Sequence, residues 1–129
     1  MSKPNPTEFK YTKEHEWARD NGDGTVTMGI TDHAQHLLTD IVFVELPVMG
    51  KQVQQGKQAA VVESVKSVSD VYASVSGEVV EVNSALEGSP ETVNQDAFGG
   101  GWIMKIKMSN AAELANMMDA AAYDALIAG

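Results

Sequence analysis

Hydrophobic and polar residues alternate along much of this chain with the two-residue period of β-strands. The strongest turn signal is Asp20-Asn21-Gly22-Asp23-Gly24, and the alternating run Thr25-Val26-Thr27-Met28-Gly29-Ile30 follows it. This run predicts a strand with one buried and one exposed face. Similar runs predict further strands at residues 11–19, 41–46, 59–62, 71–75, 77–83 and 102–108. We therefore expect a mainly β protein.

Two stretches have the three- and four-residue spacing of helices instead. Thr31 or Asp32 is expected to cap a short helix through about Leu38, with Leu37 and Leu38 facing the core. In the C-terminal segment, Asn110 and Glu113 predict a capping box, and Asp119 is expected to cap a second helix. The predicted hydrophobic stripes of these C-terminal helices are Leu114, Met117 and Met118, then Tyr123, Leu126 and Ile127.

The length of 129 residues is that of one domain, so residues 1–129 are predicted to form a single unit. Residues 1–9 are polar and contain Pro4 and Pro6, which predicts a loose arm. Residues 84–100 are expected to form a long connection without a regular element, and residues 110–129 a helical appendage.

The stretch Glu63-Ser64-Val65-Lys66-Ser67-Val68-Ser69-Asp70 joins two valine-rich runs and predicts a tight hairpin with Val65 and Lys66 near its tip. The tip contains no glycine or asparagine, which the common two-residue turns need for positive φ angles. We therefore expect a turn with negative φ angles. The tip presents one long amine among small polar residues, which is the arrangement that an enzyme attaching a prosthetic group to lysine requires.

Composition removes several classes of function. The chain has no cysteine, which excludes disulfides, thiolate metal sites and a cysteine nucleophile. Its formal net charge of −9 argues against nucleic acids and anionic membranes as partners and favours docking onto basic surfaces. No hydrophobic run is long enough to span a membrane, and residues 1–4 do not begin a secretory signal. The expected location is the cytoplasm.

Six collinear blocks of the sequence form a specific pattern: Tyr11-Thr12-Lys13-Glu14-His15-Glu16-Trp17, Gly29-Ile30-Thr31-Asp32-His33-Ala34-Gln35, Asp40-Ile41-Val42-Phe43-Val44-Glu45-Leu46-Pro47, Val62-Glu63-Ser64-Val65-Lys66, Ser76-Gly77-Glu78-Val79-Val80-Glu81-Val82-Asn83 and Gly101-Trp102-Ile103-Met104-Lys105-Ile106-Lys107. Through these blocks the chain resembles the glycine cleavage H-protein family, and the resemblance extends over nearly its whole length. It implies a barrel-sandwich hybrid of two antiparallel sheets. It also implies that Lys66 carries lipoate through an amide bond.

The resemblance further implies a carrier that performs no catalysis itself. Its partners would be a pyridoxal-phosphate glycine decarboxylase, a tetrahydrofolate-dependent aminomethyltransferase and dihydrolipoyl dehydrogenase with FAD and NAD. A lipoate-protein ligase or lipoyl transferase would modify it. The carrier would shuttle an aminomethyl group on the lipoyl arm. Because that cargo is cationic and prone to hydrolysis, the carrier should shelter it beside an anion.

Four further residues lie in or near blocks that match the family, and the resemblance assigns them to the arm. Glu16 and Asp70 are expected to supply the anions, and His33 to line the same cleft. Glu63, three residues before Lys66, is expected to help the lipoylating enzyme to recognise the hairpin.

Two other classes of function fit parts of the sequence. His33 and His36, with Asp32 and Asp40 nearby, have the spacing of metal ligands on a helix, but a full ligand set is lacking. A carrier of another kind would be a biotinyl module, which normally has methionines beside the lysine, or a lipoyl module that relays lipoate to other proteins. The relay function would use the same lysine.

The sequence departs from the family pattern at three places. Val48-Met49 replaces a stretch that is commonly acidic, Ser67 stands where alanine is frequent, and Ala97-Phe98-Gly99-Gly100 predicts a looser loop. Such changes concern docking and loop stiffness, and they leave Lys66, Glu63 and Asp70 in place.

Overall fold

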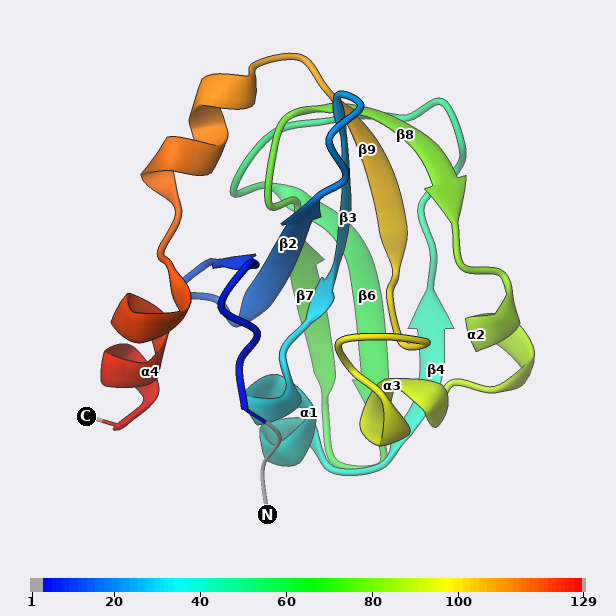
Figure 1. The fold of residues 1–129 in the computed structure, drawn as a ribbon. Coiled ribbons are helices and arrows are strands. Elements are labelled where there is room, and N and C mark those ends of the chain that lie inside the picture. Colours follow the sequence, from blue (N-terminus) through cyan, green and yellow to red (C-terminus); the bar gives the residue numbers. More distant parts are fainter. Residues whose placement is uncertain (1–3, 129) are drawn as a thin grey trace.

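The computed structural model describes residues 4–128, which form two antiparallel sheets with short helices around them (Figure 1). The six-stranded sheet has the order β1 (Lys10–Tyr11), β2 (Glu16–Asp20), β3 (Thr25–Ile30), β9 (Met104–Met108), β8 (Gly77–Val82), β5 (Gln52–Val53). The three-stranded sheet has the order β4 (Ile41–Glu45), β6 (Gln58–Ser64), β7 (Val68–Tyr72). The expected mainly β sandwich is confirmed.

The helices are short and lie at the margins of the sheets. They are α1 (Asp32–Leu38), α2 (Ala85–Gly88), α3 (Thr92–Gln95), the 3₁₀-helix η1 (Ala111–Asn116) and α4 (Ala120–Ala128). The helix predicted at residues 32–38 is confirmed, with the hydroxyl of Thr31 accepting from the Ala34 amide as its cap. Helices α2 and α3 lie in the stretch predicted to be irregular, and β5 is a strand that the alternation did not reveal.

The main core fills the space between the two sheets. Its largest fully buried members come from both sheets and from the 84–103 connection, and they include Met28, Val44, Val62, Leu86, Ile103, Met104 and Ile106. Burial of such side chains stabilises the fold by about 2 kcal/mol each. The prediction that Leu37 faces this core is wrong, because Leu37 is 51% exposed and Ala34 and Gln35 take the buried positions of α1.

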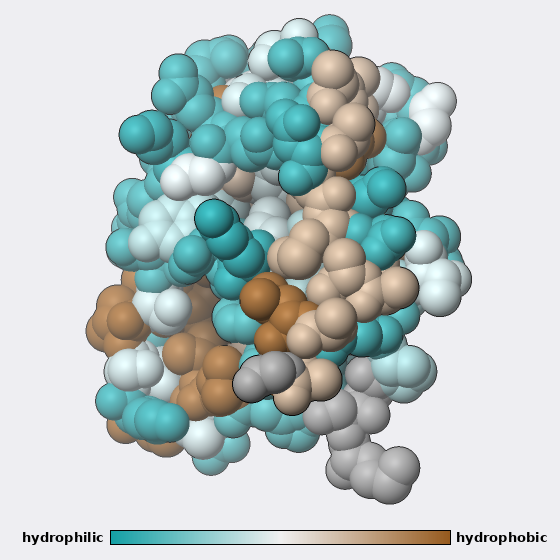
Figure 2. Space-filling model, turned by 90° about the vertical axis from the view of Figure 1, so that its left-hand side faces the viewer, coloured by the Kyte–Doolittle hydropathy of each residue, from teal (hydrophilic) through white to brown (hydrophobic). Residues whose placement is uncertain are grey.

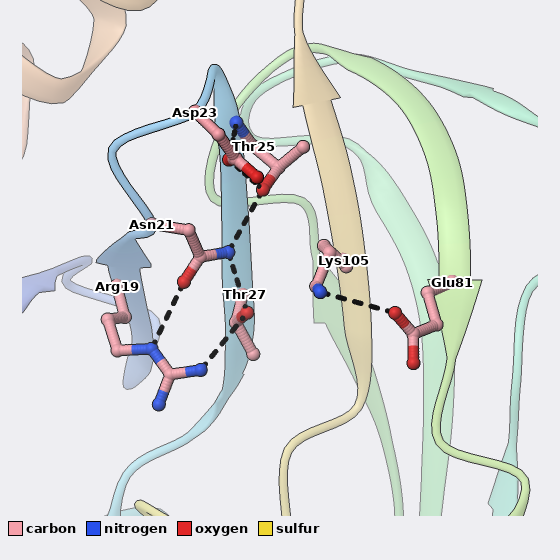
Figure 3. Close-up of polar contacts among 7 residues, drawn as sticks. All are labelled: Arg19, Asn21, Asp23, Thr25, Thr27, Glu81 and Lys105. Atoms are coloured by element: carbon pink, nitrogen blue, oxygen red, sulfur yellow. Dashed lines mark hydrogen bonds and ion pairs between the residues drawn. The ribbon is translucent and has the colours of Figure 1, made fainter.

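Strand β3 is buried on both faces, so the prediction of a half-exposed strand is wrong. Thr27 is covered by the side chains of Arg19 and Asn21, whose Nη2 and Nδ2 atoms donate to its hydroxyl (Figure 3). Gly29 is covered by Trp17, and a Cβ atom at Gly29 would lie 3.0 Å from the indole nitrogen. The alternation did not reveal this second layer, because threonine and glycine are equally common on exposed faces.

The second layer is a separate hydrophobic cluster that joins the two ends of the chain. Its buried members are Phe9, Tyr11, Trp17, Ala120 and Tyr123. The ring of Phe9 stacks on Trp17 and the ring of Tyr11 on Tyr123, each at 4.9 Å between centroids. Phe9, the last residue of the arm predicted to be loose, is therefore packed, whereas residues 1–3 of that arm lie outside the described residues.

The C-terminal segment is helical as predicted, but its contacts differ. Asn110 caps η1 through the Ala112 amide, whereas the Glu113 carboxylate accepts hydrogen bonds from the amide and hydroxyl of Ser76 instead of closing a capping box. The predicted stripe of Leu114, Met117 and Met118 is divided. Leu114 and Met117 pack on the main core, and the Met118 backbone pairs with Tyr11.

Asp119 caps α4 through the Ala122 amide, as predicted. In the predicted stripe of this helix, Tyr123 is fully buried and Ile127 is partly buried against the second cluster, but Leu126 is 44% exposed. Figure 2 shows the alanine-rich η1 and α4 as a band of weakly hydrophobic residues along this face.

The loop at residues 97–100, predicted to be looser than in the family, is held by hydrogen bonds at both of its ends. The carbonyl oxygen of Ala97 accepts from the indole of Trp17 at 2.9 Å, and the Asp96 carboxylate accepts from the Gly100 amide at 2.8 Å. A Cβ atom at Gly99 would lie 2.5 Å from that carboxylate. The glycine therefore permits a close approach, and the resulting contacts hold the loop.

Removing the hydroxyl of Tyr123 is expected to destabilise the protein. This oxygen lies 2.7 Å from the Thr31 hydroxyl and 2.8 Å from Nδ1 of His15, and the side chain is fully buried. Tyr123→Phe removes both hydrogen bonds. Nδ1 of His15 loses this partner, whereas Thr31 keeps its bond with the Ala34 amide, and the free energy of unfolding should fall by about 2 kcal/mol. Urea unfolding measures this change. In the control, Tyr72→Phe, the hydroxyl has no hydrogen-bond partner among residues 4–128, and an equal loss there would contradict the prediction.

Candidate functional site

The hairpin between β6 and β7 presents Lys66 at its tip. Strand β6 ends at Ser64 and β7 begins at Val68, so the connection has three residues, and Lys66 is exposed as predicted. The hydroxyl of Ser64 accepts from the amides of Lys66 and Ser67 at 3.1 and 3.0 Å, and the Ser64 amide donates to the Ser67 carbonyl at 2.8 Å. No tip residue has a positive φ angle, which confirms that prediction. A serine side chain thus supplies the turn geometry that glycine usually supplies.

The hairpin tip rests against the C-terminal end of α1, and both lie at the lower end of the molecule in Figure 1. The Val65 amide donates to the Asp40 carbonyl at 3.0 Å, and Nζ of Lys66 donates to the Leu37 carbonyl at 3.0 Å. The tip is therefore fixed by backbone contacts, while the lysine amine remains at the surface.

A groove of about 100 Å³, here called the small groove, begins beside this contact. Its hydrophobic walls come from β3, α1, β6 and β7 and consist of Ile30, Ala34, Leu37, Leu38, Val62 and Val71. Its polar residues are Glu14, His15, Glu16, Ser69 and Asp70. Figure 2 shows hydrophobic residues gathered in the lower left of the view, towards the end where α1 and the hairpin tip lie.

Glu16 is buried between the two sheets, with only 2% of its surface exposed. Its carboxyl accepts from the Thr12 hydroxyl and from the Tyr72 amide, the latter at 3.1 Å. Burial raises the pKa of Glu16 to about 7, against the opposing effect of these hydrogen bonds. A second groove of about 370 Å³, the large groove, lies between η1 and the sheets and also contains Glu16, together with Tyr11, Tyr72 and Met117. Glu16 therefore lines both grooves.

His15, which the sequence did not single out, lines the small groove, whereas His33 lines neither groove. The two rings lie 4.9 Å apart, and Nδ1 of His15 is 2.8 Å from the Tyr123 hydroxyl. Burial, and secondarily the neighbouring His33, lower the pKa of His15. His15 also has a φ angle of 72°, which is unusual for a residue other than glycine.

The predicted site residues are thus only partly brought together. Glu16 and Asp70 share the small groove, which opens beside the carbonyl that Lys66 contacts. Glu63 is half-buried in β6, paired with Phe43 on one side and Val68 on the other, and it flanks the tip. His33 packs against His15 and does not line the small groove.

The predicted histidine pair does not form a metal centre. Nε2 of His36 lies 3.2 Å from the Asp32 carboxylate, while the His33 ring packs against His15. In residues 4–128, no three histidine, aspartate or glutamate side chains are grouped so that they could hold a metal ion.

Reasoning from sequence missed three contacts that shape the site. They are the Ser64 hydroxyl within the turn, the Leu37 carbonyl that Lys66 contacts, and the Tyr123 hydroxyl beside His15. Ser64 could have been found, since serine hydroxyls often cap turns that lack glycine. The other two join residues 29 and 108 positions apart, and no local pattern indicates such pairs.

Comparison with known proteins gives consistent results for the whole chain. Residues 9–128 match the profile of the family described as glycine cleavage H-protein. The glycine cleavage system H protein of Escherichia coli O7:K1 is 59% identical over 122 residues, which cover 95% of each chain. That of Marinomonas sp. strain MWYL1 is 58% identical over 123 residues, covering 95% of this chain and 97% of the relative.

The same similarity is found among solved structures. The crystal structure of a glycine cleavage system H protein from Mycobacterium marinum superposes with a TM-score of 0.88 at 36% identity, covering 97% of this chain and all of that one. None of the helices within residues 4–128 has the length and hydrophobicity needed to cross a membrane.

The raised pKa of Glu16 predicts a specific dependence of stability on pH. With a pKa of about 7 when folded and 4.5 when unfolded, Glu16 binds its proton more tightly in the folded state. Its contribution to the free energy of unfolding is therefore full below pH 4.5 and is lost as the pH rises to 7. The stability of Glu16→Gln relative to the unsubstituted protein should increase by about 3 kcal/mol between pH 4.5 and 8.

Chemical unfolding at a series of pH values measures this difference. The control is Glu14→Gln, which removes the same charge from an exposed neighbour and should show no comparable trend. A difference between Glu16→Gln and the unsubstituted protein that does not change with pH would contradict the prediction.

Proposed function

Because the chain belongs to the glycine cleavage H-protein family, we propose that Lys66 is the lysine that carries its lipoyl group. The protein is the lipoyl carrier of glycine cleavage; it holds lipoate covalently on a lysine and is not itself a catalyst. The observation that supports Lys66 is its place at the exposed tip of a short hairpin whose turn is held by Ser64. A modifying enzyme can reach this amine without unfolding any strand.

The lipoyl group, when attached, would supply a disulfide, one sulfur of which can bond to the aminomethyl group of glycine while the other becomes a thiol. The chain provides a rigid base for the arm, a groove beside it and an acidic surface. An amide-linked lipoyl-lysine is about 14 Å long, as estimated from ordinary bond lengths. Such an arm can leave the surface of the carrier and enter the site of another protein.

The protein works with the other components of glycine cleavage. In detail, we propose three partner enzymes: a pyridoxal-phosphate glycine decarboxylase, a tetrahydrofolate-dependent aminomethyltransferase and dihydrolipoyl dehydrogenase. A lipoate ligase or lipoyl transferase would be the modifying enzyme. The net charge of −9 supports docking onto basic surfaces around their active sites. We further propose that residues 1–129 act as one carrier domain in the cytoplasm, with Glu63 recognised by the modifying enzyme.

We also propose that the small groove shelters the loaded arm. Its hydrophobic walls exclude water, and Glu16 and Asp70 place two carboxyl groups along it. The aminomethyl group is a cation, so a neighbouring carboxylate stabilises it. Because Glu16 has a pKa of about 7, binding of this cation near neutral pH should also release a proton from it. His33 acts through His15, whose ring it contacts.

Lipoylation at Lys66 is tested by intact mass and peptide mapping after incubation with lipoate, ATP and a lipoate ligase. One lipoyl group on the peptide containing Lys66 is expected, and none on Lys66→Arg. Lys57→Arg is the matched control, since Lys57 is another exposed lysine in a turn beside β6. A lipoyl group on another lysine, or none with a ligase that modifies a known carrier, would refute the assignment.

The sheltering role is tested by the rate at which the loaded arm loses its aminomethyl group to water. Glu16→Gln should raise this rate about tenfold, the factor of one charge-assisted hydrogen bond in a buried site. Asp70→Asn should raise it about twofold, because Asp70 is exposed and its charge is screened. Glu87→Gln, an exposed acid on α2 outside both grooves, is the control. Equal rates in all four proteins would remove Glu16 and Asp70 from the site.

A further inference from the structure

The last turn of α1 contains carbonyl groups that no residue of the helix can satisfy, as in every helix. Two of these receive donors from the following residue. The Gln35 carbonyl accepts from the Thr39 amide at 2.9 Å, and the Leu38 carbonyl accepts from the Thr39 hydroxyl. The Leu37 carbonyl lies between them in sequence, and its donor is Nζ of Lys66, at 3.0 Å. The lysine that we assign as the attachment site thus satisfies one of the terminal carbonyl groups of α1.

The chain leaves α1 through a backbone conformation that is unfavourable for its residue. Thr39 has φ 65° and ψ −147°, a region that β-branched residues rarely occupy. Such a conformation is strained, and it persists only where surrounding contacts hold it. Contacts with other parts of the chain must therefore stabilise the backbone conformation of Thr39.

Asn94 on α3 supplies these contacts. Its Nδ2 donates to the Thr39 carbonyl and to Oε1 of Gln35, both at 2.8 Å, and its Oδ1 accepts from the Ile41 amide at 2.9 Å. One side chain, more than fifty positions away in sequence, thus connects the last turn of α1 to the first residue of β4. Asn94 therefore holds residues on both sides of Leu37, namely Gln35 and Thr39.

The same short segment also holds the backbone of the hairpin tip. The Asp40 carbonyl accepts from the Val65 amide at 3.0 Å, one residue before the lysine. Residues 37–40 therefore contact the tip twice, through the backbone at Val65 and through the side chain at Lys66. The backbone contact keeps Lys66 close to α1 whether or not its amine is bound.

We propose that the Leu37 carbonyl is the resting site of the Lys66 nitrogen in the lipoylated protein as well as in the unmodified one, and that Asn94 is the residue that positions it. An ammonium group has three N–H donors, and the amide formed on lipoylation keeps one of them. That remaining N–H can donate to the same carbonyl. The proposal rests on the assignment of Lys66 as the attachment site.

This resting site explains how a flexible arm is directed towards the small groove. Leu37 lines that groove and also supplies the carbonyl, so an arm held there by its amide starts at the edge of the groove. Holding the first part of the arm lowers the entropy lost when its far end enters. The aminomethyl group at the far end of the arm then approaches Glu16 and Asp70 from an arm that is anchored at the Leu37 carbonyl.

The experiment follows the amide proton on Nζ of lipoylated Lys66 by NMR, in protein containing lysine labelled with ¹⁵N at Nζ. In the unsubstituted protein this proton should exchange with water about fivefold more slowly than in a lipoyl-lysine peptide, the factor of one net hydrogen bond. Asn94→Asp keeps the acceptor for the Ile41 amide and loses both donors, so it should remove most of this protection. Asn116→Asp, the same substitution at an exposed position of η1, should leave it unchanged.

Exchange at the peptide rate in the unsubstituted protein would overturn the resting site, whether or not Asn94→Asp folds. Protection that persists in folded Asn94→Asp would overturn the role of Asn94. Failure of the attachment assignment is recognised separately, because the mass of the Lys66 peptide is determined before the NMR measurement. Thermal unfolding of each variant confirms that the compared proteins are folded.

Discussion

The buried carboxyl of Glu16 is the interaction on which the site depends. It stands on β2 of the six-stranded sheet and accepts the amide of Tyr72 at the end of β7 in the three-stranded sheet. One side chain therefore ties the two sheets together where the small and large grooves meet. Ionisation of a carboxyl at this depth lowers the stability of the folded protein, and the pKa of Glu16 is raised for the same reason. Such an acid is typical of sites that bind charge.

The C-terminal segment belongs to this site although it lies far from the lysine. Tyr123 of α4 is buried against Tyr11 and brings its hydroxyl to His15 and to Thr31, the cap of α1. The Tyr123 hydroxyl thus holds both His15, which lines the small groove, and Thr31, which begins α1. Helix α4 therefore does more than cover the sheet, since its Tyr123 helps to position His15.

The lysine hairpin combines a fixed base with a free end. Ser64 fixes the turn, and Asp40 holds the backbone beside it. Within residues 4–128, the hydrogen bond of the Lys66 amine is to the Leu37 carbonyl, at the surface. A carrier needs both properties, because its partners must find the lysine in one place while the arm must leave that place to reach them. Stiffness in the backbone and freedom in the side chain satisfy the two demands together.

The sequence by itself determined most of the strands, the turn at residues 20–24, helix α1 and the exposed lysine at a hairpin tip, because each depends on neighbouring residues whose periods and turn preferences are local. Only the tertiary structure decided that β3 is buried on both faces, that Glu113 bonds to Ser76, and that His15 lines the groove where His33 was expected. The burial of Gly29 under Trp17 and the contact of His15 with Tyr123 depend on a second hydrophobic cluster joining residues 9–17 to residues 120–127. Contacts at that separation are chosen by packing and burial of the whole chain, and no local pattern encodes them.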